Sequence, residues 1–240
     1  MRHSRRFVLL SGAGYAVPTF DGSYSLFGDA KKGYVEIYSS GTLTFSKKTI
    51  VDVFVMGSGL KGVDGSENSS GTISYKYGGA GGKGAKGATY TGIEAMGDYA
   101  ITIAAACSST STANASSAFG NSVRTTGASG GAGANEANGK NGSSGVSIPF
   151  GDSNNFPLNY GGGGGGGGGS RNNGTSSISY QPGSGGSIGG GKGAFTSAAV
   201  AGEANTGGGG GGGSGTTRKN GGNGGSGLVI VRWGDWSDAA

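Results

Sequence analysis

The sequence predicts an all-β protein: a small β-sandwich-like module of short strands with an inserted bundle of polyglycine II helices, and little or no α-helix. Three observations lead to this prediction. Short runs of β-branched and aromatic residues alternate over the first 106 residues, glycine makes up 60 of the 240 residues, and glycine often recurs at every third position. Three residues form one turn of a polyproline-II-type helix. No window keeps a 3.6-residue period without interruption by glycine.

The predicted strands are short alternating runs bounded by Gly, Ser and Lys turns. The clearest are Tyr34 to Tyr38, Thr42 to Phe45, Ile50 to Met56, Ile73 to Tyr77 and Tyr99 to Ile103. In the third, Val51, Val53 and Val55 share one face and Asp52, Phe54 and Met56 share the other, because successive side chains alternate.

A last strand, Leu228 to Trp233, stands alone at the far end of the chain. An isolated strand leaves backbone groups and apolar side chains unsatisfied in water. We therefore expect it to pair within the N-terminal module, beside Val51 to Met56.

The N-terminus has two interpretations. Arg2 to Arg6 precede the apolar run Phe7 to Leu10, which is how a signal peptide begins, but the run stops after four residues at Ser11. We interpret the run as a first strand, with a cleaved signal peptide as the alternative. No stretch approaches the roughly 18 apolar residues of a membrane helix, and the single Cys107 cannot form an internal disulfide.

Glycine-rich tracts follow the first strands. They are Gly78 to Gly87, Gly127 to Gly133, Gly139 to Gly145, Gly161 to Gly169, Gly183 to Gly193, Gly207 to Gly213 and Gly221 to Gly227. Collagen would need many more triplets and abundant proline, whereas the chain has four prolines. A disordered low-complexity chain is the other alternative, but the alternating strands, the net charge of only +5 and the three-residue period favour order.

A single polyproline-II-type helix has no internal hydrogen bonds, so its backbone groups must find partners on neighbouring helices. Glycine also loses the most entropy on ordering, and only a laterally bonded bundle could offset that loss. We therefore expect residues 1–106 with 228–234 to form the β-strand module. Residues 107–227 are expected to form the polyglycine II bundle with exposed loops, joined by the tract at 78–88.

Motifs for catalysis are weak. Gly57, Gly59 and Gly62 have dinucleotide-fingerprint spacing, but no helix follows. Lys83, Lys140 and Lys192 complete no phosphate-binding loop, and the single histidine, His3, lies in a basic tail. Asp64, Glu67 and Asn68 could supply oxygen ligands, but their spacing matches no calcium loop. The sequence thus predicts no enzyme, no cofactor and no metal site, and its lysine pairs are typical of solvated turns.

Four segments resemble a known family. They are Val51 to Gly57, Tyr77 to Gly87, Ser117 to Gly120 and the ending Gly224 to Trp233. Together they resemble the glycine-rich domain proteins of phage and prophage tails, similar in principle to tail-fibre tip adhesins with polyglycine II helices. A similar fold occurs in ectodomains of certain animal receptor kinases, so the resemblance indicates the fold more specifically than it indicates the function. Gly57 to Gly62 replaces the longer glycine run expected after the third strand, which suggests an incomplete first helix.

The resemblance implies host recognition through loops at the end of the bundle. The expected function is that of a tail-fibre adhesin on the virion or another extracellular surface. Its expected partners are a bacterial surface polysaccharide or outer-surface protein and other tail-fibre subunits, with no nucleic acid and no membrane insertion. A non-binding structural spacer and a surface-polysaccharide hydrolase are the alternatives.

The loops suggest which end binds. If each glycine tract crosses the bundle once, residues 146–160 and 194–206 share one end, and 135–138, 170–182 and 214–220 share the other. The first set is apolar and the second polar, so we expect the second to form the free tip, roughly 20 to 30 Å from the module. The predicted receptor-binding residues are Arg171, Asn172, Asn173, Tyr180, Gln181, Arg218, Lys219 and Asn220. Tyr180 is expected to stack on rings of an anionic or sugar-rich receptor, and Arg171, Arg218 and Lys219 to supply charge; ordinary solvated turns are the alternative.

Overall fold

The computed structural model describes residues 16–110, 117–120, 123–124, 138–149, 157–161, 164, 167–172, 175–216 and 220–235. Within these residues the regular elements are strands, arranged in three antiparallel sheets, and no α-helix occurs. The predicted all-β class is therefore confirmed. The predicted strand at Phe7 to Leu10 lies outside the described residues.

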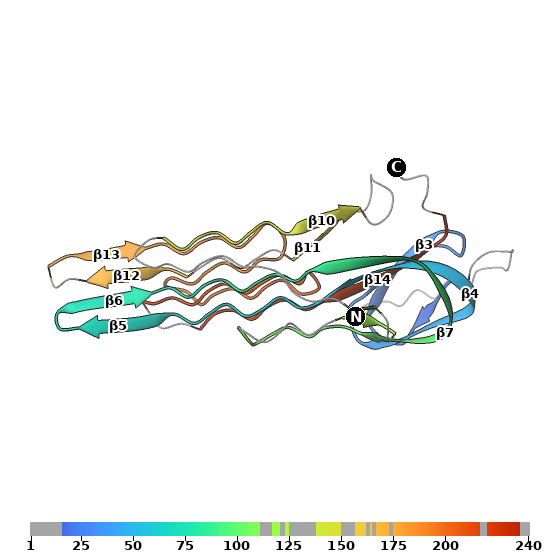
Figure 1. The fold of residues 1–240 in the computed structure, drawn as a ribbon, viewed down its shortest axis with the longest axis horizontal. Coiled ribbons are helices and arrows are strands. Elements are labelled where there is room, and N and C mark those ends of the chain that lie inside the picture. The colour runs from blue at the N-terminus through green and yellow to red at the C-terminus, as the bar shows by residue number, and fades with distance from the viewer. Residues whose placement is uncertain are drawn as a thin grey trace.

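The β module is the largest sheet and lies at one end of the molecule (Figure 1). Its strands run in the order β2-β3-β14-β4-β7-β8-β9, with β1 paired to β4. Their bounds are β1 Thr19–Phe20, β2 Tyr24–Gly28, β3 Gly33–Ile37, β4 Gly41–Met56, β7 Gly87–Thr102, β8 Ala118–Phe119, β9 Val123–Arg124 and β14 Leu228–Trp233.

Two long strands make this single sheet fold over on itself. β4 and β7 are 16 residues each, and their pairing shifts register between Phe45 and Thr49. Such a bulge bends a strand and increases its twist. The first half of β4 therefore pairs with β1, whereas its second half pairs with β14. The result is a sandwich-like module whose two layers share β4 and β7.

The core lies between these layers. Val51, Val53 and Val55 belong to the larger hydrophobic cluster, while Phe54 and Met56 belong to a second cluster on the other side of β4. The predicted alternation along this strand is confirmed. The larger cluster is completed by side chains from the first half of β4 and from other strands, among them Val35, Ile37, Leu43, Phe45, Ile101, Phe119, Val229, Val231 and Trp233.

The last strand occupies the centre of the sheet. β14 pairs antiparallel with β3 on one side and with β4 on the other, with Leu228 opposite Met56 and Trp233 opposite Val51. The predicted pairing beside Val51 to Met56 is confirmed. Opposite Asp52, the Arg232 guanidinium binds the same carboxylate oxygen through Nη2 at 2.7 Å and Nε at 2.8 Å.

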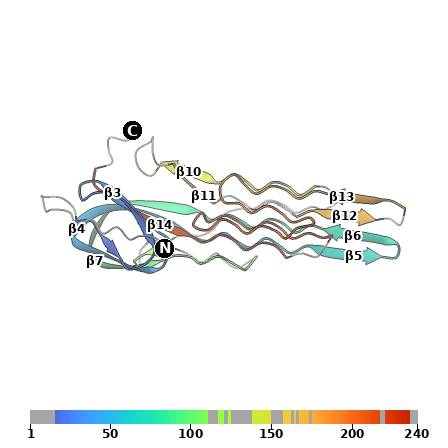
Figure 2. The same ribbon diagram turned by 180° about the vertical axis from the view of Figure 1, so that it is seen from behind.

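A glycine bundle extends from the β module as a set of side-by-side segments (Figures 1 and 2). We use this name for residues 57–65, 78–86, 104–109, 138–145, the described part of 161–168, 181–186, 189–194, 200–203, 207–215 and 220–227. These segments are joined laterally by backbone hydrogen bonds rather than by bonds within one segment. Residues 57–65 thus extend the bundle beyond the tract at 78–88 that the sequence assigns to it.

The segment Gly207–Gly215 lies at the centre of this bundle, and each of its residues is buried. Successive carbonyls along this segment accept hydrogen bonds from three neighbouring segments in turn. Those of Gly207, Gly210 and Gly213 accept hydrogen bonds from Ala85, Gly82 and Gly79; those of Gly208 and Gly211 accept from Gly225 and Gly222; those of Gly209 and Gly212 accept from Gly191 and Ala194. The partners repeat every three residues, which is the repeat of a polyproline-II-type helix.

The segment 57–65 corrects the expectation of an incomplete first helix. Gly59 and Gly62 donate to Gly225 and Gly222 at 2.9 Å each, so the segment is bonded into the bundle. A Cβ on Gly59, Gly62 or Gly65 would collide with the backbone of the central segment. Leu60 and Val63 also meet that segment, but through their carbonyls, which accept from Gly210 and Gly213. The residues between these three glycines can therefore carry side chains, as Lys61 does, without a long glycine run.

The tract Gly183 to Gly193 corrects the assumption of one crossing per tract. The chain turns at 187–189, where Gly189 has a φ of +71°, a conformation that glycine adopts without strain. Residues 194–206 are consequently not one loop at the module end. A Cβ on Gly168, which directly precedes β12, would meet the ring of Phe195, whereas Thr206 accepts a hydrogen bond from Gly161. Val200, one of the apolar residues of this range, is 53% exposed, although the apolar character of the range suggests burial.

The loop 146–160 includes the small hairpin of β10 Val146–Pro149 and β11 Pro157–Tyr160. This hairpin lies beside the bundle on the side toward the β module (Figure 1). The described part of this loop therefore lies toward the end that the alternation of crossings predicts.

Candidate functional site

A second sheet lies at the end of the glycine bundle farthest from the β module (Figures 1 and 2). We call it the tip sheet. Its strands are β5 Ser66–Ser70, β6 Ile73–Tyr77, β12 Gly169–Asn172 and β13 Ser177–Tyr180, in the order β13-β12-β6-β5. The sequence predicted β6 as a strand and residues 170–182 as a tip loop, but it did not predict that they meet in one sheet.

The tip sheet joins two hairpins that are distant in the chain. The hairpin of β5 and β6 lies between segments 57–65 and 78–86, and the hairpin of β12 and β13 follows segment 161–168. β6 pairs with β12, with Tyr75 opposite Arg171 and Lys76 opposite Ser170. The bundle therefore brings the two hairpins to the same end and holds them in register.

The two faces of the tip sheet differ in chemistry, because residues two apart on a strand share a face. One face, the aromatic face, includes Ile73, Tyr75, Tyr77, Ile178 and Tyr180. The other, the polar face, includes Glu67, Ser69, Ser74, Lys76, Ser170, Asn172, Ser177 and Ser179. The rings of Tyr75 and Tyr77 are parallel within 3° with centroids 6.0 Å apart, and Ile178 is 49% exposed.

Three predicted binding residues lie in this sheet. Arg171 and Asn172 belong to β12, and Tyr180 ends β13. The register pairs Arg171 with Tyr75 and Ile178 and places Tyr180 on the aromatic face, whereas the exposed Asn172 belongs to the polar face. Asn173, Arg218 and Lys219 lie outside the described residues.

Gln181 and Asn220 lie apart from that face. The Gln181 N–H donates to Asn138 Oδ1 at 2.8 Å and its carbonyl accepts from Gly139 at 2.7 Å, so its backbone belongs to the bundle. Asn220 precedes Gly221, whose N–H donates to Asp64 Oδ1 at 2.9 Å. Asn220 is therefore at the β5 side of the tip sheet, and β6 and β12 separate it from Tyr180.

The sequence prediction missed Tyr75 and Tyr77 as site residues, because their strand was assigned to the β module. A signal was nevertheless present. Gly59, Gly62 and Gly65 precede the hairpin with a three-residue period, and Gly78, Gly81 and Gly84 follow it with the same period. A strand pair flanked on both sides by such segments leaves and re-enters the bundle, and so lies at its far end.

Asp64 anchors the base of the tip sheet. Its Oδ1 accepts from Lys61 Nζ at 2.8 Å as well as from Gly221. The Lys61 hydrogen bond, followed by that from the Gly221 backbone, lowers the pKa of the Asp64 carboxyl. Glu67 and Asn68 are successive residues of β5 and point to opposite faces, so the three do not converge. In the part of the chain that the structure describes, no three His, Cys, Asp or Glu side chains form a group that could hold a metal ion.

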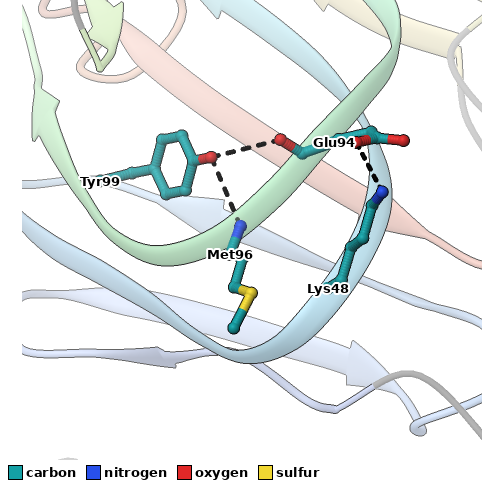
Figure 3. A network of polar contacts seen from close by, with 4 residues as sticks. All are labelled: Lys48, Glu94, Met96 and Tyr99. Carbon is teal, nitrogen blue, oxygen red and sulfur yellow. Dashed lines mark hydrogen bonds and ion pairs between the residues drawn. The ribbon is translucent and has the colours of Figure 1, made fainter.

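The opposite end of the molecule carries a small polar network (Figure 3). Lys48 Nζ and Glu94 Oε2 are 2.7 Å apart, and their side chains are 62% and 60% exposed. The Tyr99 hydroxyl donates to the Glu94 carbonyl at 3.3 Å and accepts from the Met96 N–H at 3.4 Å. Exposed ion pairs contribute little stability, so this network offers control positions far from the tip sheet.

Comparison with known proteins identifies the domain family. Among the residues that the structure describes, none belong to a helix long and apolar enough to cross a membrane. No curated protein matches the chain. The model of a family described as a glycine-rich domain matches residues 38–234, which include the bundle, the tip sheet and the strands β4, β7, β8, β9 and β14 of the β module. This match covers most of the 240 residues, and the chain belongs to the glycine-rich domain family.

Proposed function

We propose that this protein is a receptor-binding adhesin of a phage or prophage tail, which attaches to a bacterial surface through the tip sheet. The observation that carries the proposal is the position of that sheet: a small, uncovered sheet with partly exposed tyrosines at the far end of a hydrogen-bonded bundle (Figure 1). Recognition residues are commonly found on segments that a rigid scaffold holds out into solvent.

The bundle suits the role of a spacer. The nine residues of Gly207–Gly215 at about 3.1 Å each span about 28 Å, and each of their neighbours is fixed by lateral hydrogen bonds. In this proposal the tip contacts a surface polysaccharide or an outer-surface protein. Other tail-fibre subunits hold the module end, where β2 is an edge strand with Tyr24 and Leu26 about 40% exposed.

A cell-binding assay tests the proposal against the spacer alternative. Fluorescently labelled protein is incubated with intact cells of a panel of bacterial strains, and bound fluorescence is measured by flow cytometry. We expect saturable binding to at least one strain. The triple variant Arg171→Ala, Tyr180→Ala, Arg218→Ala is expected to keep its melting temperature and to lose at least 90% of the binding.

The matched control is the double variant Lys48→Ala, Glu94→Ala at the opposite end, which is expected to bind like the parent. Absence of binding to every strain would support a spacer. Full binding by the folded triple variant would move the binding site away from these three residues. Release of soluble polymer from the cell surface during incubation would instead indicate a hydrolase.

A further inference from the structure

We propose that the aromatic face of the tip sheet binds a saccharide chain, with Tyr75 and Tyr77 as the main stacking residues and Tyr180 at its edge. The inference rests on the proposed function and specifies the class of receptor for the same site. It adds two residues that neither the sequence motifs nor the loop analysis had assigned to binding.

The composition of the face favours sugar rings. The face presents phenol rings and two isoleucines, and Asn68 of β5 lies in the same cross-strand row as Tyr75. A pyranose has apolar C–H faces that stack on aromatic rings and hydroxyls that need hydrogen-bond partners. Tyrosine offers both an apolar ring and a polar end, and Asn68, which is exposed, adds an amide donor and acceptor.

The arrangement of the rings also fits an extended chain. Tyr75 and Tyr77 lie parallel within 3° along β6, so successive sugar units can meet rings of the same orientation. On the neighbouring strand the residue opposite Tyr180 is Gly169, which has no side chain to fill the space beside the Tyr180 ring. Arg171 occupies the register position between Tyr75 and Ile178.

The size of the face argues against a protein as its sole partner. Four strands at about 4.8 Å spacing and four to five residues at about 3.3 Å give a footprint of roughly 300 Å². A stable protein interface buries about 800 Å² on each partner. A few sugar rings can be held by such a face, whereas a protein receptor would need contacts well beyond it.

No other strand covers the aromatic face in the described part of the chain. The strands of the tip sheet make their extensive strand contacts with one another, and none of the strands of the β module lies across them. Both ribbon views show the tip hairpins projecting beyond the strands of the module and the glycine segments (Figures 1 and 2). On this face Ile178 is 49% exposed, Asn68 is exposed, and Tyr75, Tyr77 and Tyr180 are partly exposed, so these side chains can meet a ligand from solvent.

The test measures binding of the full-length protein to an immobilised panel of oligosaccharides taken from bacterial capsules and lipopolysaccharides. We expect the parent to bind at least one saccharide. Tyr75→Ala with Tyr180→Ala is expected to weaken that binding at least tenfold. Tyr75→Phe keeps the ring and is expected to stay within about threefold of the parent.

The matched control changes the other face of the same strands. Lys76→Ala with Ser179→Ala is expected to bind within twofold of the parent, and circular dichroism melts check that each variant is folded. Undiminished binding by the folded Tyr75, Tyr180 double variant would overturn the inference, as would equal losses from the two faces.

A parallel arm separates the two kinds of receptor. If the protein binds cells but no saccharide, and protease treatment of the cells removes binding while periodate oxidation of their sugars does not, the receptor is a protein and the inference is wrong. Absence of both cell and saccharide binding would overturn the inference and the adhesin function together. Saccharide binding without cell binding would retain the inference and reject the adhesin function.

Discussion

At the scale of single residues, the stability of the bundle depends on positions at which the backbone of one segment contacts the backbone of another. Gly210 donates to Leu60 at 2.9 Å, accepts from Gly82 at 2.6 Å, and is enclosed by neighbouring segments. A Cβ at this position would collide with the carbonyl oxygen of Gly222. The obstacle is main chain rather than a side chain that could rotate away, so the neighbouring segment itself would have to move.

The first prediction concerns this position. Gly210→Leu is expected to lower the free energy of unfolding by about 3 kcal/mol or more, in the upper range for overpacked cores, because backbone must shift. Lys83→Leu places the same side chain on an exposed position of a neighbouring segment and is expected to change stability by less than about 0.5 kcal/mol. Urea unfolding of both variants measures the difference, and equal midpoints would mean that the central segment is not enclosed as described.

Gly165, which the sequence places in the middle of another tract, lies outside the described residues. The sequence predicts that a side chain at this mid-tract position would also push neighbouring backbones apart.

The second prediction concerns the pH dependence that Asp64 confers. Its folded-state pKa is lowered by Lys61 and by the Gly221 N–H, so its contribution to stability is present above the unfolded value of about 3.9. That contribution is lost as pH falls below about 4 through the folded-state pKa. The carboxylate is partly exposed, so the effect is expected to be small and to weaken in salt.

Thermal melts between pH 6 and pH 2 test this expectation, and Asp64→Asn should have a shallower loss of melting temperature over that range than the parent. Parallel curves for the two proteins would show that Asp64 does not titrate with folding.

At the scale of elements, the strand β14 brings the C-terminal part of the chain into the sheet formed by the N-terminal strands. It lies between β3 and β4 in the sheet and contributes Val229, Val231 and Trp233 to the larger core cluster. Ile230 faces the second cluster with Phe54 and Met56. Without it, β3 and β4 would lose their common partner and both clusters would open to water.

The third prediction follows from this position. Deletion of residues 228–240 is expected to abolish the cooperative thermal transition of the whole protein. Deletion of 236–240 alone, which leaves β14 intact, is the matched control and is expected to preserve the transition. A normal melt of the longer deletion would show that the sheet forms without its central strand.

Much of the element level could be predicted from the sequence. The pairing of Leu228 to Trp233 follows from the need of any strand for partners, and the faces of Val51 to Met56 follow from alternation. The hairpins β5–β6 and β12–β13 are different, because their partnership depends on the path of the bundle. Ser-rich strands such as Ser66 to Ser70 have no apolar period, so only neighbouring strands reveal them.

Loop positions were predictable only where the chain crosses the bundle without turning. The strands β12 and β13, which belong to the predicted loop 170–182, lie at the tip (Figure 1). The tract Gly183 to Gly193 contains Ser187 and Ile188 before Gly189, and it folds back there. The sequence of a glycine-rich tract does not distinguish a turning glycine from a crossing one, because both lack a side chain.

At the scale of the whole molecule, three strands of the β module continue into three segments of the bundle, and those segments are hydrogen-bonded to one another in the same order as the strands. β14, β4 and β7 are consecutive in the sheet, and each runs directly into a bundle segment: 220–227, 57–65 and 78–86. Segment 57–65 bonds to both of the others, with Gly59 donating to Gly225 and Leu60 donating to Lys83. The order of the strands therefore continues into the bundle without a break.

This continuity implies that the module and the bundle unfold as one unit, and the last prediction tests it with a smaller substitution at Gly210 than leucine. Gly210→Ala is expected to destabilise the central segment while leaving the protein folded. Because each strand of the central trio ends in a segment of the bundle, loosening of those segments should be transmitted to the sheet. Hydrogen exchange measured by mass spectrometry should then accelerate by the same factor in a peptide covering 51–56 as in one covering 207–215, since the slowest amides of both exchange through global unfolding.

Ile50→Ala, at a partly exposed position of β4, serves as a module-side control that should also accelerate both peptides equally. Faster exchange in 207–215 alone would show that the bundle opens independently, and the two parts would then be separate folding units joined end to end.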